Sequence, residues 1–152
     1  MELTAAMKKE AATSNDGHKY FGVTNWNLNY RTTLAEIDGL HFIDKADIAL
    51  DIIYHLPNRI TSEGEDLYAQ EWNRFYTALY DHEKVHATIA ETHAKELYDA
   101  FLSRKDFSNK EEVRLFRIQT ANKYFENIRA NNRQYDKETN QGETQGARLR
   151  SL

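Results

Sequence analysis

The chain has 152 residues, 40% of them hydrophobic, which suffices for one domain with a buried core and is too short for two ordinary domains. Its net charge is −4 and its basic residues are dispersed, so the sequence lacks the concentrated positive charge of a nucleic-acid-binding protein. No apolar run approaches the roughly 18 to 20 residues of a membrane span. The absence of cysteine excludes disulfides and thiolate metal sites. Any zinc must therefore bind His, carboxylate or carbonyl groups, a ligand set more typical of catalytic than of structural zinc.

The first third of the chain predicts an arm followed by strands. Residues 1–18 are small and polar, and we expect a flexible arm ahead of a single domain over residues 19–152. Large apolar and asparagine side chains alternate within Tyr20–Thr32, which predicts a half-buried strand. Alternating apolar residues predict a second strand over Asp47–Leu56, ended by the proline that follows. Between the strands, Thr33–Asp44 has two apolar residues at helical spacing, which favours a short helix or a loop.

A long helix follows the polar loop expected over residues 58–66. The stretch Glu65–Lys105 contains neither proline nor glycine, and its large residues recur three and four positions apart from Trp72 to Leu97. His82, His86 and His93 continue this series. The sequence therefore predicts one long amphipathic helix whose histidines face the core.

A second helix and a polar tail complete the chain. Ser108–Glu111 fits a capping box, and the helix that follows has a broad apolar face and is expected to fray near Asn131-Asn132. The short link between the two helices predicts antiparallel neighbours. The tail Tyr135–Leu152 has few apolar residues, so it is either disordered or held by specific contacts. Strands followed by helices predict an α+β fold, in which a small antiparallel sheet packs on the long helix beside the second helix.

The centre of the long helix carries the motif H-E-x-x-H at His82, Glu83 and His86. Residues four apart on a helix share a face, so the two imidazoles can bind one metal ion while Glu83 projects beside it as a general base. The alternative is that both histidines are hydrogen-bonded core residues and Glu83 is a solvated charge. His93 lies about 10.5 Å of helix rise beyond His86 and is too distant to share the ion. We interpret His93 as a core histidine or as one that supports a metal ligand.

Several segments together resemble an uncharacterised bacterial family whose members are described as predicted secreted zinc-dependent proteases. These segments are Trp26–Tyr30, Leu56–Pro57, Trp72–Phe75, His82–His86 and Tyr135–Thr139. The likeness extends over roughly Tyr20 to Leu149. It implies a zincin-like fold, Zn²⁺ as cofactor and a peptide or protein substrate. It also implies a secreted or periplasmic location, although the first twenty residues lack the apolar centre of a signal peptide.

The tail departs from this family's pattern at one position. The family has Tyr-Asp-x-x-Thr-x-His-Gly followed by Gln-Gly-Ala, and the resemblance implies that its His is the third zinc ligand. The present chain has Tyr135 and Asp136 in place, and later Gln145-Gly146-Ala147, but it has Gln141 at the His position. An amide oxygen is a poorer zinc ligand than imidazole or carboxylate, so Gln141 would form a weaker site.

Other groups could supply the third ligand. Asp136 could bind the ion directly, and so could a carboxylate of the second helix such as Glu112 or Glu126. We favour Asp136 over Gln141, while Asp136 could equally be a turn residue or one that orients His82 or His86. Tyr135 could hydrogen-bond a developing oxyanion or simply pack within the loop.

Three functional hypotheses remain open. The first is a zinc metallopeptidase that uses Glu83 as the general base. The second, which Gln141 motivates, is a catalytically impaired zincin-like binding module with a weak or empty metal site. The third is an α+β domain whose histidines are structural. The substrate and the oligomeric state are open as well.

Overall fold

The computed structural model describes residues 12–13, 19–59 and 68–150. Most of the arm expected over residues 1–18, and the greater part of the loop expected over 58–66, lie outside this range. Ala12–Thr13 (β1) and Lys19–Tyr20 (β2) form a short antiparallel pair with Ala12 opposite Tyr20. None of the helices in the described ranges has the length and apolar content of a membrane span.

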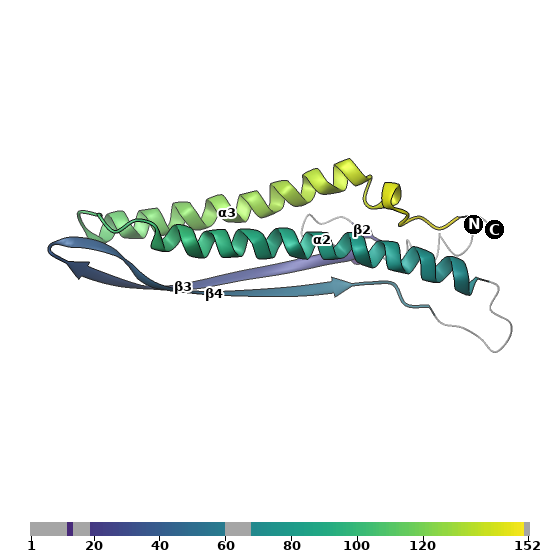
Figure 1. The fold of residues 1–152 in the computed structure, drawn as a ribbon, viewed down its shortest axis with the longest axis horizontal. Helices are drawn as coiled ribbons and strands as arrows, with labels where there is room; N and C mark the ends of the chain where they lie inside the picture. The colour runs from purple at the N-terminus through teal and green to yellow at the C-terminus, as the bar shows by residue number, and fades with distance from the viewer. Residues whose placement is uncertain (1–11, 14–18, 60–67, 151–152) are drawn as a thin grey trace. The chain divides into compact units, whose positions relative to one another are not determined.

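The main sheet is a two-stranded hairpin of Val23–Ile37 (β3) and Leu40–His55 (β4), drawn side by side in Figure 1. The link is the dipeptide Asp38-Gly39, whose φ angles are 53° and 78°. Positive φ at both central residues is the requirement of the type I′ hairpin turn, for which Asp-Gly is a preferred sequence. Both expected strands are confirmed and are longer than expected. The short helix or loop expected over residues 33–44 is wrong, because the turn chemistry decides the structure there.

Two long helices follow, Ala69–Leu102 (α2) and Lys110–Thr139 (α3). The described residues therefore form an α+β structure, as expected, in which the two-stranded hairpin of β3 and β4 is followed by two long helices. At the start of α3, Asn109 Oδ1 accepts the Glu112 N–H at 3.0 Å, and Glu112 Oε2 accepts the Ser108 N–H at 3.0 Å. This is a reciprocal cap displaced by one residue from the expected one, because Glu111 pairs with Arg114 instead.

The helix α3 continues beyond Asn131-Asn132 to Thr139, so the expected fraying of the helix at those residues is wrong. Tyr135 and Asp136 consequently lie on a helix and not in a loop. Their contacts with the histidines of α2, described below, compensate for the sparse apolar residues of this last stretch.

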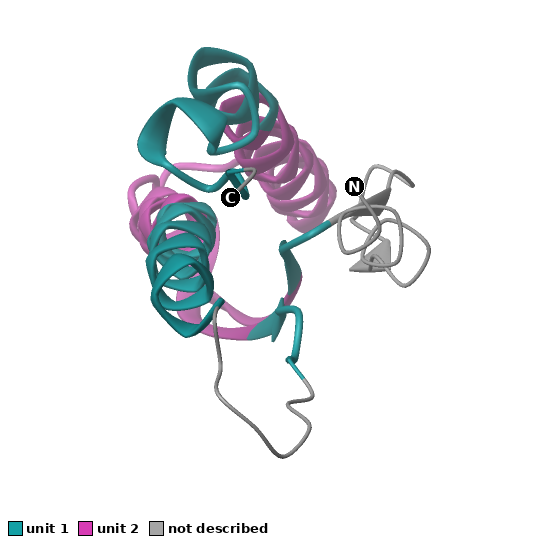
Figure 2. Cartoon of the chain, turned by 90° about the vertical axis from the view of Figure 1, so that its right-hand side faces the viewer, with its two compact units in different colours: residues 1–26, 52–87, 133–152 teal, residues 27–51, 88–132 magenta. Residues whose placement is uncertain are grey.

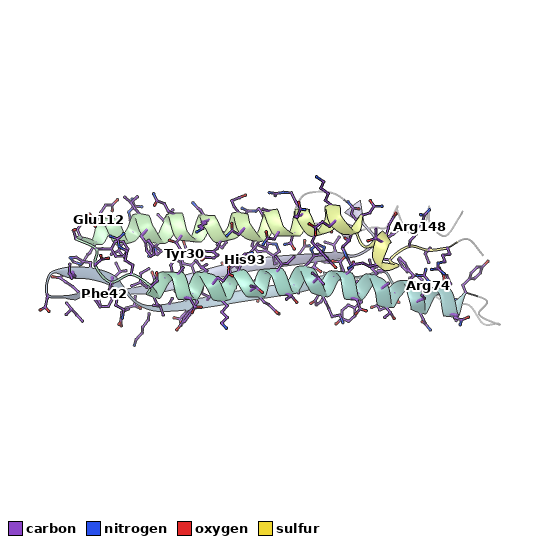
Figure 3. The ribbon with its side chains drawn as sticks, turned by 45° about the horizontal axis from the view of Figure 1, so that its top comes forward. Tyr30, Phe42, Arg74, His93, Glu112 and Arg148 are labelled. Atoms are coloured by element: carbon purple, nitrogen blue, oxygen red, sulfur yellow. The ribbon has the colours of Figure 1, made fainter. Side chains whose placement is uncertain are left out.

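The tail after α3 is held by specific contacts. It contains the 3₁₀ helix Glu143–Gln145 (η1). Arg74 donates to the carbonyl oxygens of Gly146 at 2.8 Å and Arg148 at 2.6 Å. Glu71 accepts from Arg74 and from the Arg150 N–H at 2.8 Å. Figure 3 shows Arg74 and Arg148 close together. Of the two alternatives for the tail, specific contacts are confirmed over its described part.

The chain divides into two compact units (Figure 2). Unit 1 comprises residues 1–26, 52–87 and 133–152, and unit 2 comprises 27–51 and 88–132. Each unit thus takes part of the hairpin and part of both long helices.

The core of unit 1 is built on Phe75, Leu79 and Ala147, which are all buried. The ring of Phe75 meets Phe21 edge-on at 6.1 Å between centroids and lies 5.7 Å from Trp72. Because Ala147 belongs to the tail and Leu79 to α2, one cluster fixes both segments around the stretch that carries His82 and His86.

The core of unit 2 is aromatic. Tyr30 of β3 lies 5.2 Å from Phe101 of α2, and Phe107 lies 4.9 Å from Phe116 of α3, between ring centroids. Phe107 also exchanges two backbone hydrogen bonds with His41 of β4, at 2.8 and 3.1 Å. These contacts hold the connection between α2 and α3 to the hairpin.

Candidate metal centre

Helix α2 brings two imidazoles together in unit 1. His82 and His86 lie one helical turn apart, and their side chains are buried, with 3% and 8% exposure. Their Nε2 atoms are 3.2 Å apart, and the rings are nearly perpendicular at 89°. The helical spacing of the motif therefore produces two adjacent nitrogen atoms inside the protein.

Asp136 of α3 completes the group. Its Oδ1 lies 3.2 Å from His82 Nε2 and 3.0 Å from His86 Nε2. Burial raises the pKa of Asp136, but its close contacts with the two imidazoles outweigh burial and lower that pKa to about 2. The side chain is therefore an ionised carboxylate at neutral pH, next to two imidazole nitrogens.

The three residues form a possible metal-binding triad. Tetrahedral zinc with ligands at about 2.0–2.1 Å separates those ligands from one another by about 3.3–3.4 Å. The corresponding separations here are 3.0, 3.2 and 3.2 Å. Imidazole nitrogen and carboxylate oxygen are also ligands that such an ion prefers. Geometry and chemistry thus fit one divalent ion with a fourth position left for another ligand.

Glu83 is buried beside the triad, with 3% exposure, and is not the solvated charge of the alternative interpretation. Thr24 of β3 donates its hydroxyl towards Glu83 Oε2 at 2.7 Å, with the Glu83 carbonyl oxygen 3.0 Å away. Burial raises the pKa of Glu83, and the Thr24 hydrogen bond and the two imidazoles oppose this rise. A side chain at Gly22 would come within 2.7 Å of Glu83 Oε1. Position 22 is therefore suited to glycine, which has no Cβ to approach the Glu83 carboxyl.

A second layer of contacts surrounds His82. Its Nδ1 lies 2.9 Å from Oε1 of Gln145, and the Tyr135 ring stacks on it at 4.8 Å and 17°. The Tyr135 hydroxyl is 3.0 Å from both amide atoms of Gln145. A Cβ at Gly142 would lie 3.0 Å from the Cγ of His82. Tyr135 is thus in contact with a ring of the triad.

The other candidates for the third ligand are engaged elsewhere. Gln141 is exposed, with φ at 56°, and its N–H donates to the Asp136 carbonyl oxygen at 2.8 Å. The helix α3 ends at Thr139, and Asn140 and Gln141, both with positive φ, form the turn after it, where the Gln141 side chain is exposed. Both Glu112 and Glu126 belong to unit 2, where Glu112 caps α3 and Glu126 pairs with Arg129.

His93, labelled on α2 in Figure 3, also belongs to unit 2. Its Nδ1 is 2.8 Å from Glu96 and its Nε2 is 2.7 Å from Asn131. His93 is half-buried, and both of its ring nitrogens have a hydrogen-bond partner.

The sequence does not predict Thr24, Gly22, Gly142 or Gln145 as site residues. Thr24 and Glu83 are 59 positions apart, so no local pattern connects them. The only available signal for Gln145 was its place in the Gln-Gly-Ala segment of the resembling family.

Comparison with known proteins gives one match. Residues 1–143 match the model of a family described as "Bacterial protein of unknown function (DUF922)". The chain belongs to the DUF922 family. No curated protein and no solved structure matches it. The matched part of this DUF922 protein includes His82, Glu83, His86 and Asp136, and it ends just before Gln145.

Proposed function

We propose that this DUF922 protein is a zinc-dependent metallopeptidase with a zincin-like active site. The observation that carries the proposal is the buried triad of His82, His86 and Asp136 with the buried carboxyl of Glu83 beside it. Burying several ionisable groups around one point costs folding free energy, which a bound ion can offset, and such clusters are found preferentially at functional sites.

The three triad residues would hold the ion. Zinc bound there supplies Lewis-acid chemistry, because it polarises a scissile carbonyl and acidifies water. Glu83 takes a proton from the water that attacks the carbonyl carbon, and returns that proton to the nitrogen of the leaving amine as the peptide bond breaks. Its raised pKa suits a group that must both accept and release a proton near neutral pH.

The same two-histidine, one-carboxylate set also binds non-haem Fe(II) in oxygenases. Glu83 favours hydrolysis, since a base next to the ion has a direct role in water activation. A peptide or protein substrate, and a secreted or periplasmic location, are further parts of the proposal that rest on the resemblance.

A non-catalytic binding module is the alternative function, and it is favoured by Gln141 at the position of the family's histidine. This alternative predicts a metal centre that does not hydrolyse peptides. The presence of Asp136 within 3.2 Å of both Nε2 atoms speaks against it, because this carboxylate can replace the missing histidine.

The test compares zinc-loaded wild type with Glu83→Gln on a library of unstructured peptides. We expect the variant to bind zinc as the wild type does and to lose about 100-fold or more of the turnover, the range for removal of a general base. Glu91→Gln, on the exposed face of α2, serves as control and should keep full activity. Metal binding without hydrolysis by the wild type would favour the binding module, and equal turnover by Glu83→Gln would refute the role of Glu83.

A further inference from the structure

The segment that follows α3 is a fixed loop against α2. Four of its residues have positive φ, namely Asn140, Gln141, Gly142 and Gly146. Gly142 accepts the backbone N–H groups of Gln145 at 2.9 Å and Ala147 at 3.0 Å. Arg74 of α2 binds the Gly146 carbonyl oxygen, and Ala147 is buried in the core of unit 1. These contacts define where the Gln145 side chain lies relative to α2.

The contact between Gln145 and His82 determines a proton position. Gln145 Oε1 can only accept a hydrogen bond, so the His82 Nδ1 at 2.9 Å must carry the hydrogen. A neutral imidazole has one such hydrogen, which leaves a lone pair on Nε2. That Nε2 is the atom 3.2 Å from Asp136 and 3.2 Å from His86. The contact therefore selects the tautomer that a metal ligand needs.

Tyr135 contacts both polar atoms of the Gln145 amide. Its hydroxyl is 3.0 Å from both Oε1 and Nε2 of Gln145, so it can donate to the first and accept from the second. Its ring stacks on His82, and Gly142 leaves no room for a side chain against the same imidazole. Amide, hydroxyl and loop backbone together restrict the orientation of the His82 ring.

We propose that Gln145 is a positioning residue of the metal centre, which holds His82 as the Nδ1–H tautomer and thereby directs the Nε2 lone pair towards the site shared with His86 and Asp136. The proposal deepens the proposed function and rests on its metal site. Removing the group that accepts the second ring N–H of a metal-binding histidine usually weakens metal affinity about 10- to 100-fold.

The first test measures zinc affinity by competition with a chromophoric chelator. Gln145→Ala should bind zinc about 10- to 100-fold more weakly than the wild type, and Gln145→Glu, which keeps an acceptor, should restore the affinity. Gln145 is exposed, so neither change opens the core. Gln134→Ala, which removes an exposed glutamine of α3 that pairs with Glu138, is the control and should leave the affinity unchanged. An affinity of Gln145→Ala within twofold of the wild type would overturn the proposal.

The second test reads the tautomer directly, by ¹⁵N NMR of the imidazoles in the metal-free protein. We expect His82 in the wild type to be the Nδ1–H tautomer and to become a mixture of tautomers in Gln145→Ala. An Nε2–H tautomer in the wild type, or an unchanged Nδ1–H tautomer in Gln145→Ala, would overturn the proposal. Because this measurement needs no zinc, a wild type that fails to bind zinc would refute the proposed function while the NMR result still decides the role of Gln145.

Discussion

Replacing Asp136 by Asn isolates the contribution of the triad's one carboxylate. Asn has nearly the same size, but its amide oxygen carries no charge and is a poor ligand for zinc. In the structure, Asp136 Oδ1 is 3.2 and 3.0 Å from the Nε2 atoms of His82 and His86, and its pKa of about 2 keeps it ionised at neutral pH. The substitution therefore removes a full negative charge from the centre of the site without changing its shape.

The magnitude follows from linkage between binding and folding. Zinc at about 1,000 times its dissociation constant stabilises the folded state by about 4.1 kcal/mol. For a chain of this size, that corresponds to a rise of about 8–16 °C in the thermal midpoint. Loss of a residue that merely supports a metal ligand weakens metal binding by up to about 100-fold. If loss of the Asp136 carboxylate has an effect of that size, the same zinc concentration stabilises the folded state by only about 1.4 kcal/mol. The expected rise for Asp136→Asn is then only about 3–6 °C.

The assay is a thermal unfolding scan of each protein with and without zinc, so that each variant is compared with its own metal-free form. Asp81→Asn is the matched control, because it removes an exposed carboxylate of α2, which pairs with Lys84 at 2.7 Å and lies outside the triad. It should show the full wild-type rise. A full rise in Asp136→Asn would show that Asp136 is not a ligand and would refute the reasoning.

Three further predictions concern the surroundings of the triad. Gly142→Ala should lower zinc affinity, whereas Gly39→Ala, with a similar positive φ but nothing within 4 Å of its added Cβ, should cost only stability; equal zinc affinities would contradict this. Thr24→Val should destabilise the fold by about 1.5–3 kcal/mol in denaturant titrations, because the buried Glu83 loses a hydrogen bond, while Thr24→Ser should restore most of that stability. Glu71 has its pKa lowered to about 2 by its hydrogen bonds, so its stabilisation is present above the ordinary pKa near 4.5 and is lost as the pH falls towards 2; Glu71→Gln should therefore unfold more easily than the wild type at pH 7 but not at pH 2.

The parts of the site that the sequence predicts are those set by local geometry. His82, Glu83 and His86 lie within one helical turn, and the helix could be inferred from the spacing of large residues around them. Asp136 came from the Tyr-Asp pair of the resembling family and not from any spacing, because nothing in the sequence states that α3 returns to this turn of α2.

Two errors have physical causes. The helical spacing of Leu34 and Ile37 outweighed the Asp38-Gly39 turn signal, although the positive φ angles of that pair decide the hairpin. The sparse apolar residues after Asn131 suggested a loop, but α3 is stabilised there by contacts of its polar side chains. Thr24 is a third case, since its partner is 59 residues away and only the folded chain brings them together.

The most direct test of the account is the metal content per chain, by elemental analysis of protein purified without chelator or added metal and then dialysed. We predict close to one zinc per chain in the wild type and close to none in the double variant His82→Ala/His86→Ala. A wild type without bound metal, or a double variant that retains as much zinc as the wild type, would contradict the assignment of the triad as the metal centre.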